Sequence, residues 1–353
     1  MKRILVIDTA ASSGGALTVL QDFHKAVCDS DTNVEWIFLL SGHYVTEREN
    51  IKVIVQPELK SHIKRLAFDC ITGRNFIKKI NPDVVFSLQN TILMGGHVPQ
   101  VVYVHQPVPF QTKYKFSFLK KEERSMAVIQ YLLGTIIKSS IRLADLVIVQ
   151  TKWMEQAVLQ QCNIKKDKIV QIYPTVEKVQ KKHKAAYHTT NTFFYPTSNA
   201  FYKNVSTLIE ACKKLDSDRL AYNLNITIGG HDTDKIKYLG KISKDEVFWY
   251  YKESCLVFPS YIETFGYPLV EAKSAGSMIL VSDCEFSHEL LDDYENAYFF
   301  DPFNSDELYK LMKAVGDGNI IRKEPKESFD LYSRNSTWNL VIGELLRVTN
   351  YYV

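Results

Sequence analysis

Two glutamates eight positions apart, Glu263 and Glu271, are the residues of this sequence best suited to chemistry. An apolar run at 255–258 precedes the first glutamate, and Pro268 stands between the two. Proline is favoured in the first turn of a helix because its missing N–H would have no partner there. We therefore expect a strand, a loop that carries Glu263, and a helix that carries Glu271 about one turn from its start.

The start of that expected helix is suited to binding an anion. The backbone N–H groups of Phe265, Gly266 and Tyr267 would be free there, and the helix dipole favours phosphate at this end. Ionised carboxylates only accept hydrogen bonds, so Glu263 and Glu271 beside a phosphate would suit the hydroxyls of a sugar nucleotide. Solvated surface carboxylates are the alternative, and the surrounding strand, Phe-Gly pair and proline favour a binding site.

The stretch 260–272 resembles the carboxylate pair of retaining, nucleotide-sugar-dependent glycosyltransferases of the GT-B class, in family four or "group 1". The resemblance implies that Glu263 contacts hydroxyls of the transferred sugar and that Glu271 holds the donor ribose. It also implies that the backbone of Phe265 and Gly266 contacts the diphosphate. The donor-binding residues expected in this stretch are Glu263, Thr264, Phe265, Gly266, Tyr267 and Glu271.

Lys203 is the cation that the same resemblance assigns to the leaving diphosphate. It follows an expected strand at 192–196 and opens a helix. Family members usually carry an arginine a few residues earlier, and Ser198 stands at that position here. Because preorganised cations and N–H dipoles stabilise a departing diphosphate strongly, we expect Lys203 to be catalytic.

Two positions in the first half complete the expected site. Gly14 and Gly15 follow the first expected strand, and paired glycines let the backbone approach a diphosphate at a helix N-terminus. The third glycine of the dinucleotide fingerprint is absent, and a simple tight turn is the alternative. His105 directly follows the strand expected at 100–104. The resemblance implies that it is catalytic and lies near the transferred sugar and the acceptor. A purely structural histidine is the alternative there.

The turn around Gly240 resembles the part of the family that reads the nucleobase. The resemblance implies that backbone groups of Lys241 and Ile242 contact the base edge. Ser243 and Glu246 have the spacing of a capping box, which predicts that a helix begins directly after this turn.

Strands and helices that alternate along the whole chain must position these residues. Nearly continuous apolar runs such as 83–87 and 146–149 are typical of a parallel sheet covered on both faces. The fold class is therefore α/β, and the resemblance implies GT-B, with two Rossmann-like, doubly wound domains that face each other across a cleft. Ligands of such sheets bind at the carboxyl ends of the strands, so we expect the site in that cleft.

A length of 353 residues suits two domains. We expect an N-terminal, acceptor-side domain at 1–176, a polar and lysine-rich linker at 177–191, and a nucleotide-sugar-binding domain at 192–334. The last helix, within 335–353, should return to the first domain. Expected strands are 3–8, 34–40, 51–55, 83–87, 100–104, 145–149, 192–196, 223–229, 255–258, 278–282 and 297–300, and expected helices of the first half are 15–28, 59–80, 123–142 and 151–161.

Composition excludes several other classes of protein. The chain is 46% hydrophobic and 24% charged, and a net charge of +3 gives no indication of nucleic-acid binding. Six cysteines lie far apart, as expected for buried thiols in the cytoplasm. No uncharged run approaches the roughly 20 residues of a membrane span. Asp-x-Asp triplets occur in polar turns only, so we expect no metal and no cofactor besides the nucleoside-diphosphate sugar.

The stretch 113–121 alternates lysines with aromatic residues. Basic amphipathic segments bind anionic surfaces, so we expect contact with the inner membrane face or a lipid-linked acceptor, and a solvated loop is the alternative. The resemblance thus implies a retaining, metal-independent hexosyltransferase that acts on a lipid-linked oligosaccharide in O-antigen or capsule synthesis. A sugar-nucleotide epimerase of the same fold and an inactive sugar-nucleotide-binding partner remain alternatives.

Overall fold

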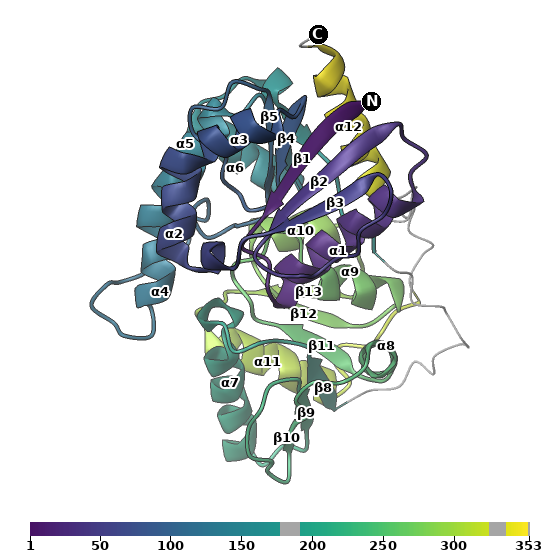
Figure 1. Ribbon diagram of the computed structural model, residues 1–353. Helices are drawn as coiled ribbons and strands as arrows, with labels where there is room; N and C mark the ends of the chain where they lie inside the picture. Colours follow the sequence, from purple (N-terminus) through teal and green to yellow (C-terminus); the bar gives the residue numbers. More distant parts are fainter. Residues whose placement is uncertain (177–190, 325–336, 352–353) are drawn as a thin grey trace. The chain divides into compact units, whose positions relative to one another are not determined.

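The computed structural model describes residues 1–176, 191–324 and 337–351 of a chain that divides into two compact units. Unit 1 comprises Met1–Thr175 and Arg334–Val353, and unit 2 comprises Val176–Ser333. The linker predicted at 177–191 lies outside the described residues except for Asn191. Each unit contains one parallel sheet with helices (Figure 1).

Unit 1 is built on a seven-stranded sheet of order β3-β2-β1-β4-β5-β6-β7, with every pair parallel. All residues of β2 are buried, as expected for an apolar strand covered on both faces. The strands are β1 (Lys2–Asp8), β2 (Val34–Leu40), β3 (Ile51–Val55), β4 (Val84–Ser87), β5 (Gln100–Val104), β6 (Leu146–Val149) and β7 (Ile169–Gln171).

Two of the long helices predicted in unit 1 are interrupted. A π-helical turn at Phe68–Thr72 joins α2 to α3, and another at Val128–Leu133 joins α4 to α5. Such turns are common at functional sites and leave side chains on a changed face of the helix. The helices are α1 (Gly14–Asp29), α2 (His62–Ala67), α3 (Gly73–Ile80), α4 (Arg124–Ala127), α5 (Gly134–Leu143) and α6 (Lys152–Cys162).

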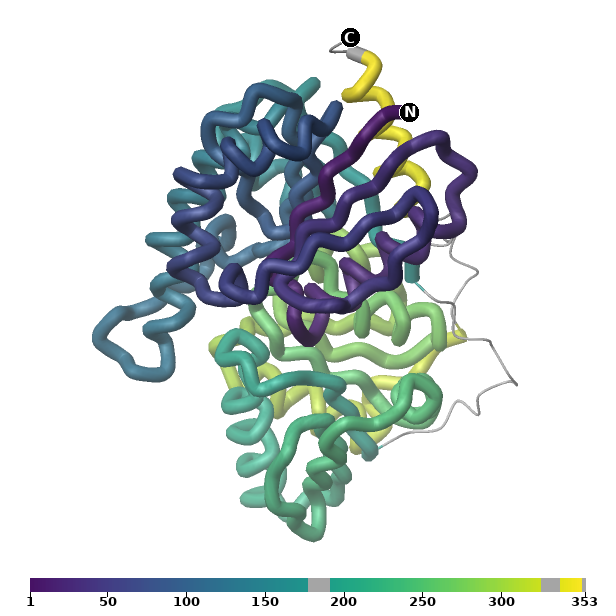
Figure 2. The backbone as a smooth tube through the Cα atoms, in the orientation of Figure 1, coloured from purple at the N-terminus to yellow at the C-terminus, as the bar shows by residue number. Residues whose placement is uncertain are grey.

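The C-terminal helix α12 (Thr337–Tyr351) packs against α1 and β4 of unit 1. Figure 2 shows this yellow helix beside the purple N-terminal strands. Trp338 lies edge-on to Phe23, with ring centroids 5.3 Å apart, and Phe23 also meets Phe86 at 5.1 Å. Burial of these large rings ties the end of the chain to the core of its first half.

Unit 2 has a six-stranded parallel sheet of order β10-β9-β8-β11-β12-β13. Its strands are β8 (Thr192–Tyr195), β9 (Asn223–Ile226), β10 (Ile236–Tyr238), β11 (Cys255–Phe258), β12 (Ile279–Ser282) and β13 (Ala297–Phe300). Its helices are α7 (Val205–Ser217), α8 (Lys244–Glu253), α9 (Tyr267–Ser274), α10 (Glu285–Leu291) and α11 (Ser305–Gly316).

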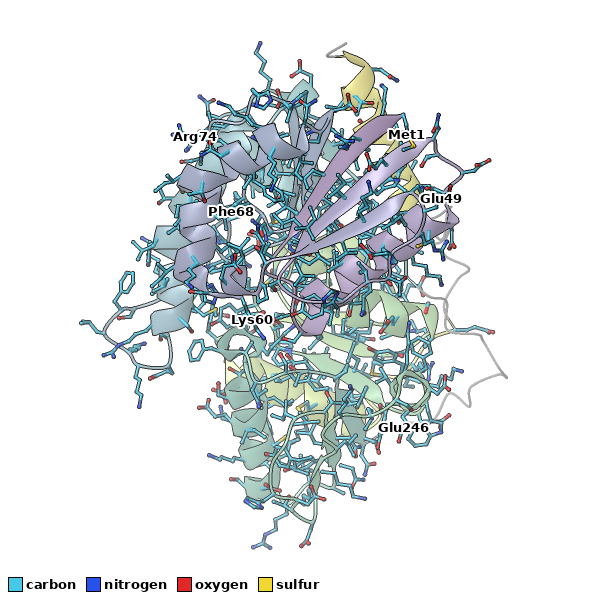
Figure 3. All side chains as sticks on the ribbon, in the orientation of Figure 1. Met1, Glu49, Lys60, Phe68, Arg74 and Glu246 are labelled. Carbon is cyan, nitrogen blue, oxygen red and sulfur yellow. The ribbon has the colours of Figure 1, made fainter. Side chains whose placement is uncertain are left out.

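The predicted pair of Rossmann-like sheets is confirmed, and the differences in the strands concern short elements. The strand predicted at 223–229 ends at Ile226, ahead of Gly229 and Gly230. The three-residue edge strands β7 and β10 were not predicted, because they lack an apolar run long enough to recognise. The capping box is confirmed: the Ser243 side chain accepts from the backbone of Glu246, and Glu246, labelled in Figure 3, caps Ser243 in return.

Candidate functional site

Lys203 and Glu263 form an ion pair at the carboxyl edge of the unit 2 sheet. Lys203 lies in the turn after β8 and Glu263 in the loop after β11, and Nζ of Lys203 is 2.5 Å from Oε1 of Glu263. The side chains are 19% and 14% exposed, respectively. Burial opposes the charge on Lys203, but the charge and hydrogen bond of Glu263 outweigh it and raise the pKa of this lysine.

A buried framework holds the two loops that carry this pair. Ser260, which is fully buried, donates its hydroxyl to Glu263 Oε1 at 2.7 Å. Asn204, in the left-handed conformation, donates its amide to the carbonyls of Pro259 at 3.2 Å and Pro302 at 2.6 Å. The loops after β8, β11 and β13 are therefore connected by hydrogen bonds, and the ion pair sits in a preorganised place.

Helix α9 begins directly beyond Glu263, where the sequence predicts phosphate binding. Gly266 is its N-cap with φ of +83°, a conformation that side chains disfavour, and Pro268 lies in the first turn. The Phe265 side chain is buried, so only its backbone can meet a ligand. Tyr267 is exposed and meets the Phe265 ring edge-on at 5.1 Å. Thr264 is half-buried beside them.

Glu271 lies one turn into α9 and accepts a hydrogen bond from the buried Tyr251 of α8 at 3.1 Å. Burial, followed by the carboxylate of Glu271, raises the pKa of Tyr251 well above its usual value, so the phenol stays a donor. Glu271 is half-buried, and this bond fixes the carboxylate. A carboxylate held in one orientation suits a diol better than a mobile one.

The remaining unit 2 candidates lie on loops after strands. Ser198 is exposed in the loop after β8, and the residue at this position is not the expected arginine. Lys241 is exposed and Ile242 half-buried in the turn after β10, and Gly240 has φ of +63°. The structure thus brings Lys203 and Glu263 into contact, and the roles predicted for these two residues and for the others stay predictions.

Gly14 and Gly15 belong to unit 1, where they are the first two residues of α1 rather than a loop before it. Gly14 has φ of +62°, and a Cβ added at either glycine would meet no atom within 4 Å. Both residues are exposed. Their backbone is therefore accessible at the N-terminus of a 16-residue helix, as the phosphate prediction requires.

His105 follows β5 and is firmly held. The side-chain oxygen of Asn90 accepts from the backbone N–H of His105 at 2.7 Å, and the ring lies edge-on to Tyr103 at 5.8 Å. Burial of the ring lowers the pKa of His105 to about 4, although a hydrogen bond with the Leu88 backbone opposes this. At neutral pH the imidazole is uncharged and can serve as a hydrogen-bonding group.

A buried polar network at the ends of β1 and β4 was not predicted from the sequence. Gln89 accepts from the Thr9 hydroxyl at 2.9 Å and donates to Asp69 Oδ1 at 2.9 Å. Asp8 accepts from the Ala11 N–H through one oxygen, while its other oxygen has no hydrogen-bond partner among the described residues. Burial raises the pKa of Asp8 and Asp69 to about 7, although hydrogen bonds and Arg65 oppose it.

Part of this network had a signal in the sequence. Asp8 ends the strand predicted at 3–8, and Gln89 follows the strand predicted at 83–87, where polar side chains reach the carboxyl edge of a parallel sheet. Asp69 lies in the π-helical turn between α2 and α3, a position that helical periodicity does not reveal. Among the described residues, no group of three or more His, Cys, Asp or Glu side chains could hold a metal ion.

Two family models match the chain. The model described as "Glycosyltransferase Family 4" covers residues 13–179, and "Glycosyl transferases group 1" covers residues 176–329. Among curated proteins, the O-antigen chain mannosyltransferase RfbU of Salmonella typhimurium is 30% identical over 260 residues, which cover 69% of this chain and 67% of RfbU.

Solved structures share the fold along nearly the whole chain. Sucrose-phosphate synthase from Thermosynechococcus elongatus has a TM-score of 0.67 at 14% identity and covers 100% of both chains. The lipopolysaccharide outer core galactosyltransferase WaaB has a TM-score of 0.62 at 16% identity over 98% of this chain and 99% of its own. Anabaena HepE in complex with UDP and glucose also reaches 0.62 at 16% identity, over 98% and 100%.

Two Rossmann-like units in one chain, with these structural neighbours, define the GT-B class of glycosyltransferases. The matches to RfbU and to the two family models also identify the family within this class. This chain is a member of glycosyltransferase family 4, the group 1 glycosyltransferases. The family prediction from residues 260–272 is thereby confirmed.

Proposed function

We propose that the chain transfers a hexose from a nucleoside-diphosphate sugar to a hydroxyl of a lipid-linked oligosaccharide, with retention at the anomeric carbon. The single observation that carries this proposal is the Lys203–Glu263 pair beside the N-terminus of α9. The relatives support the class of donor and product: HepE was solved with UDP-glucose, and RfbU is named for O-antigen mannosyl transfer. A surface polysaccharide is therefore the proposed product.

The donor would be held by groups that unit 2 already orients. Its diphosphate would lie at the N-terminus of α9, with the ribose at Glu271 and the base at Lys241 and Ile242. Lys203 would exchange its partner, from Glu263 to the diphosphate, and Glu263 would then be available to sugar hydroxyls. Ser260 keeps its hydrogen bond to Glu263 during that exchange, so the carboxylate is not left without a donor.

In the proposed reaction the bond from the anomeric carbon to the diphosphate oxygen breaks while the acceptor oxygen bonds the same carbon on the same face. The acceptor proton passes to the leaving diphosphate, so no protein nucleophile is needed. Lys203 and the helix dipole stabilise the charge that develops on the leaving group, and we propose that no divalent cation is required. Within unit 1, we propose a catalytic role for His105 and a donor-binding role for Gly14 and Gly15.

The proposed lipid-linked acceptor is supported by an exposed apolar and basic surface in unit 1. Leu119 is 89% exposed and Phe118 46%, and Tyr131, whose ring is 5.7 Å from that of Phe118, is also exposed. Glu123 is buried and accepts from Tyr114, Ser117 and Lys120, which fixes the loop that carries the apolar residues. Exposed cations of the same segment are Lys113, Lys115, Lys120, Lys121 and Arg124.

A segment that carries both exposed apolar side chains and exposed cations suits an anionic bilayer surface. We propose that this segment holds the enzyme at the inner membrane face, where its acceptor would reside. No helix among the described residues is long and apolar enough to cross a membrane. Flotation with phosphatidylglycerol vesicles should recover the protein, and Leu119→Ser together with serine at Lys113, Lys115, Lys120 and Lys121 should abolish recovery. Unchanged recovery would contradict the membrane contact.

Product analysis tests the transfer itself. Purified protein would be incubated with UDP- or GDP-sugars, with EDTA, and with a lipid-linked acceptor fraction. Glycosylated acceptor with the donor's anomeric configuration, determined by NMR, is the expected result. A free epimer of the donor sugar would instead establish an epimerase, and binding without turnover would establish an inactive partner.

A further inference from the structure

A pocket of unit 2 lies away from the predicted donor residues. It has a volume of about 360 Å³ and opens between α8 and the strands β8, β9 and β10. Thr192 and Asn223 at its wall begin β8 and β9, whereas Lys203 and Glu263 follow the ends of their strands. Ligand pockets commonly have volumes of roughly 300–1,000 Å³. The pocket is thus large enough for a small ligand and lies toward the opposite edge of the sheet.

An exposed tryptophan forms one wall of this pocket. Trp249 is 57% exposed, which is unusual for a side chain that large. Tyr250 supports it edge-on at 5.0 Å and itself stacks on Phe194 at 4.4 Å with an interplanar angle of 12°. The indole is therefore presented on a rigid base, and α8 lies beside β8 (Figure 1). The negative face of an aromatic ring attracts the polarised C–H groups of a sugar.

Polar side chains form the floor, where a sheet covered by a helix normally has apolar ones. Asn223 and Asn225 share one face of β9 because successive side chains alternate, and Asn225 pairs in register with Lys237. Asn225 is only 7% exposed, and it lines the pocket together with Asn223. An amide on a pocket wall can both donate a hydrogen bond to a ligand hydroxyl and accept one from it.

The charges around the pocket are balanced. The pocket lining includes two lysines, Lys235 and Lys237, and two acidic residues, Asp234 and Glu253. The Lys235 ammonium is already paired with Asp216 at 2.7 Å. Such a wall does not select an anion. A flat indole, an amide and charges of both signs at the rim instead match a neutral ligand rich in hydroxyls.

We infer that this pocket binds a short segment of neutral oligosaccharide, separate from the donor site. Glycan binding in this pocket goes beyond the proposed function. Only the role of the bound glycan rests on the proposed function: the glycan would be a part of the acceptor or product chain that does not react. Holding such a segment would raise the effective concentration of the reacting end.

Indole NMR tests this inference on the full-length chain. The sequence has four tryptophans, so a ¹⁵N spectrum has four indole signals, and Trp249→Phe identifies the one that belongs to Trp249. The probes are mannotriose, maltotriose, cellotriose and chitotriose. We expect at least one to shift the Trp249 signal saturably, with a dissociation constant in the millimolar range or tighter. No saturable shift with any of the four would overturn the inference.

Matched variants separate this site from the donor site. Asn225→Ser should weaken the glycan at least several-fold, and Trp249→Ala should abolish binding measured by saturation-transfer NMR of the glycan. Phe303→Ala removes another exposed aromatic side chain of unit 2 and should leave glycan binding unchanged. Glu271→Ala should leave glycan binding intact even if it abolishes nucleotide binding, so the two proposals can fail independently. A Trp249 shift with UDP or GDP instead of glycans would assign the pocket to nucleotides and contradict the inference.

Discussion

The carboxyl edges of the two sheets carry polar residues of opposite character. In unit 2, Lys203 and Glu263 are charged, partly exposed and paired mainly with each other. In unit 1, His105 is uncharged and Asp8 and Asp69 are buried carboxyls with a pKa of about 7. The first edge can exchange its internal ion pair for a charged ligand, whereas the second offers a rigid hydrogen-bonding surface. This difference agrees with the proposed diphosphate site in unit 2 and with a neutral hydrogen-bonding role for His105 in unit 1.

The largest effect should come from removing the cation of unit 2. Lys203→Ala should lower kcat by about 10²–10³, because a preorganised donor at a developing charge has that size of effect. Initial rates at saturating donor concentration would measure it, and Lys203→Arg should retain more activity. Lys214→Ala is the matched control, since Lys214 also pairs with a carboxylate, at 2.6 Å, but on an exposed face of α7. Equal rates for Lys203→Ala and Lys214→Ala would contradict a catalytic cation at the carboxyl edge of the unit 2 sheet.

Substitution of Gly266 should be the next most damaging change. Its φ of +83° costs a residue with a side chain about 1–2 kcal/mol, and strain here displaces the first turn of α9. Gly266→Ala should therefore lower both the melting temperature and the affinity for nucleotide, measured by calorimetry. Gly316→Ala, at a helical glycine where an added Cβ meets no atom within 4 Å, should be neutral or slightly stabilising. Undiminished nucleotide affinity in Gly266→Ala would argue against a phosphate site at this turn.

The buried carboxyls of unit 1 should give the protein a characteristic pH dependence. Their folded-state pKa of about 7 lies above the ordinary value of 3.8, so the folded chain binds more protons between these values. The contribution of these groups to the free energy of unfolding should thus be fully present below about pH 4, and it should be lost as the pH rises to about 7. Each group contributes about 1.4 kcal/mol per pH unit in that window. Asp8→Asn should flatten the curve in thermal melts, and an unchanged slope would contradict the assignment.

The smallest effect is spectroscopic and separates two histidines. Burial keeps the pKa of His105 in unit 1 at about 4. For His288 in unit 2, burial opposes the charged form, but hydrogen bonds to Asp292 and Asp283 outweigh it and raise the pKa. An NMR titration from pH 5.5 to pH 8 should show His288 titrating and His105 unchanged. If His105 titrated in this range, a charged imidazole would have to replace the neutral one at the unit 1 edge.

The sequence predicted most of the fold because apolar strands and helix signals are local features. Ser243 and Glu246 form the capping box that their spacing indicates, and Pro268 opens α9 as its chemistry requires. The π-helical turns at Phe68–Thr72 and Val128–Leu133 were missed, since helical periodicity continues through them. Next to these turns, Leu93 packs against Gly73 and Pro109 packs against Gly134. Such tertiary contacts have no signal in the local sequence.

The candidate site was predictable only in part, because contacts between distant residues have no signal in the local sequence. Motifs after strands identified Lys203 and Glu263, but nothing in their spacing predicts a direct ion pair. The network of Gln89 and Asp69 depends on a contact between residues 20 positions apart, which a single sequence does not reveal. Likewise, the place of the Asn225 amide in a pocket wall is visible only once the strands of unit 2 are in register.

Nucleotide binding in the absence of metal tests the central claim most directly. Thermal unfolding would be followed with UDP, GDP and their sugars for the wild-type chain, Lys203→Ala and Glu271→Ala, because a ligand of the native state raises the midpoint. We expect the midpoint to rise with one nucleotide series, and this rise to be lost in Glu271→Ala and reduced in Lys203→Ala. A wild-type midpoint that no nucleotide changes, or an equal rise in all three proteins, would contradict a donor site at the carboxyl edge of unit 2.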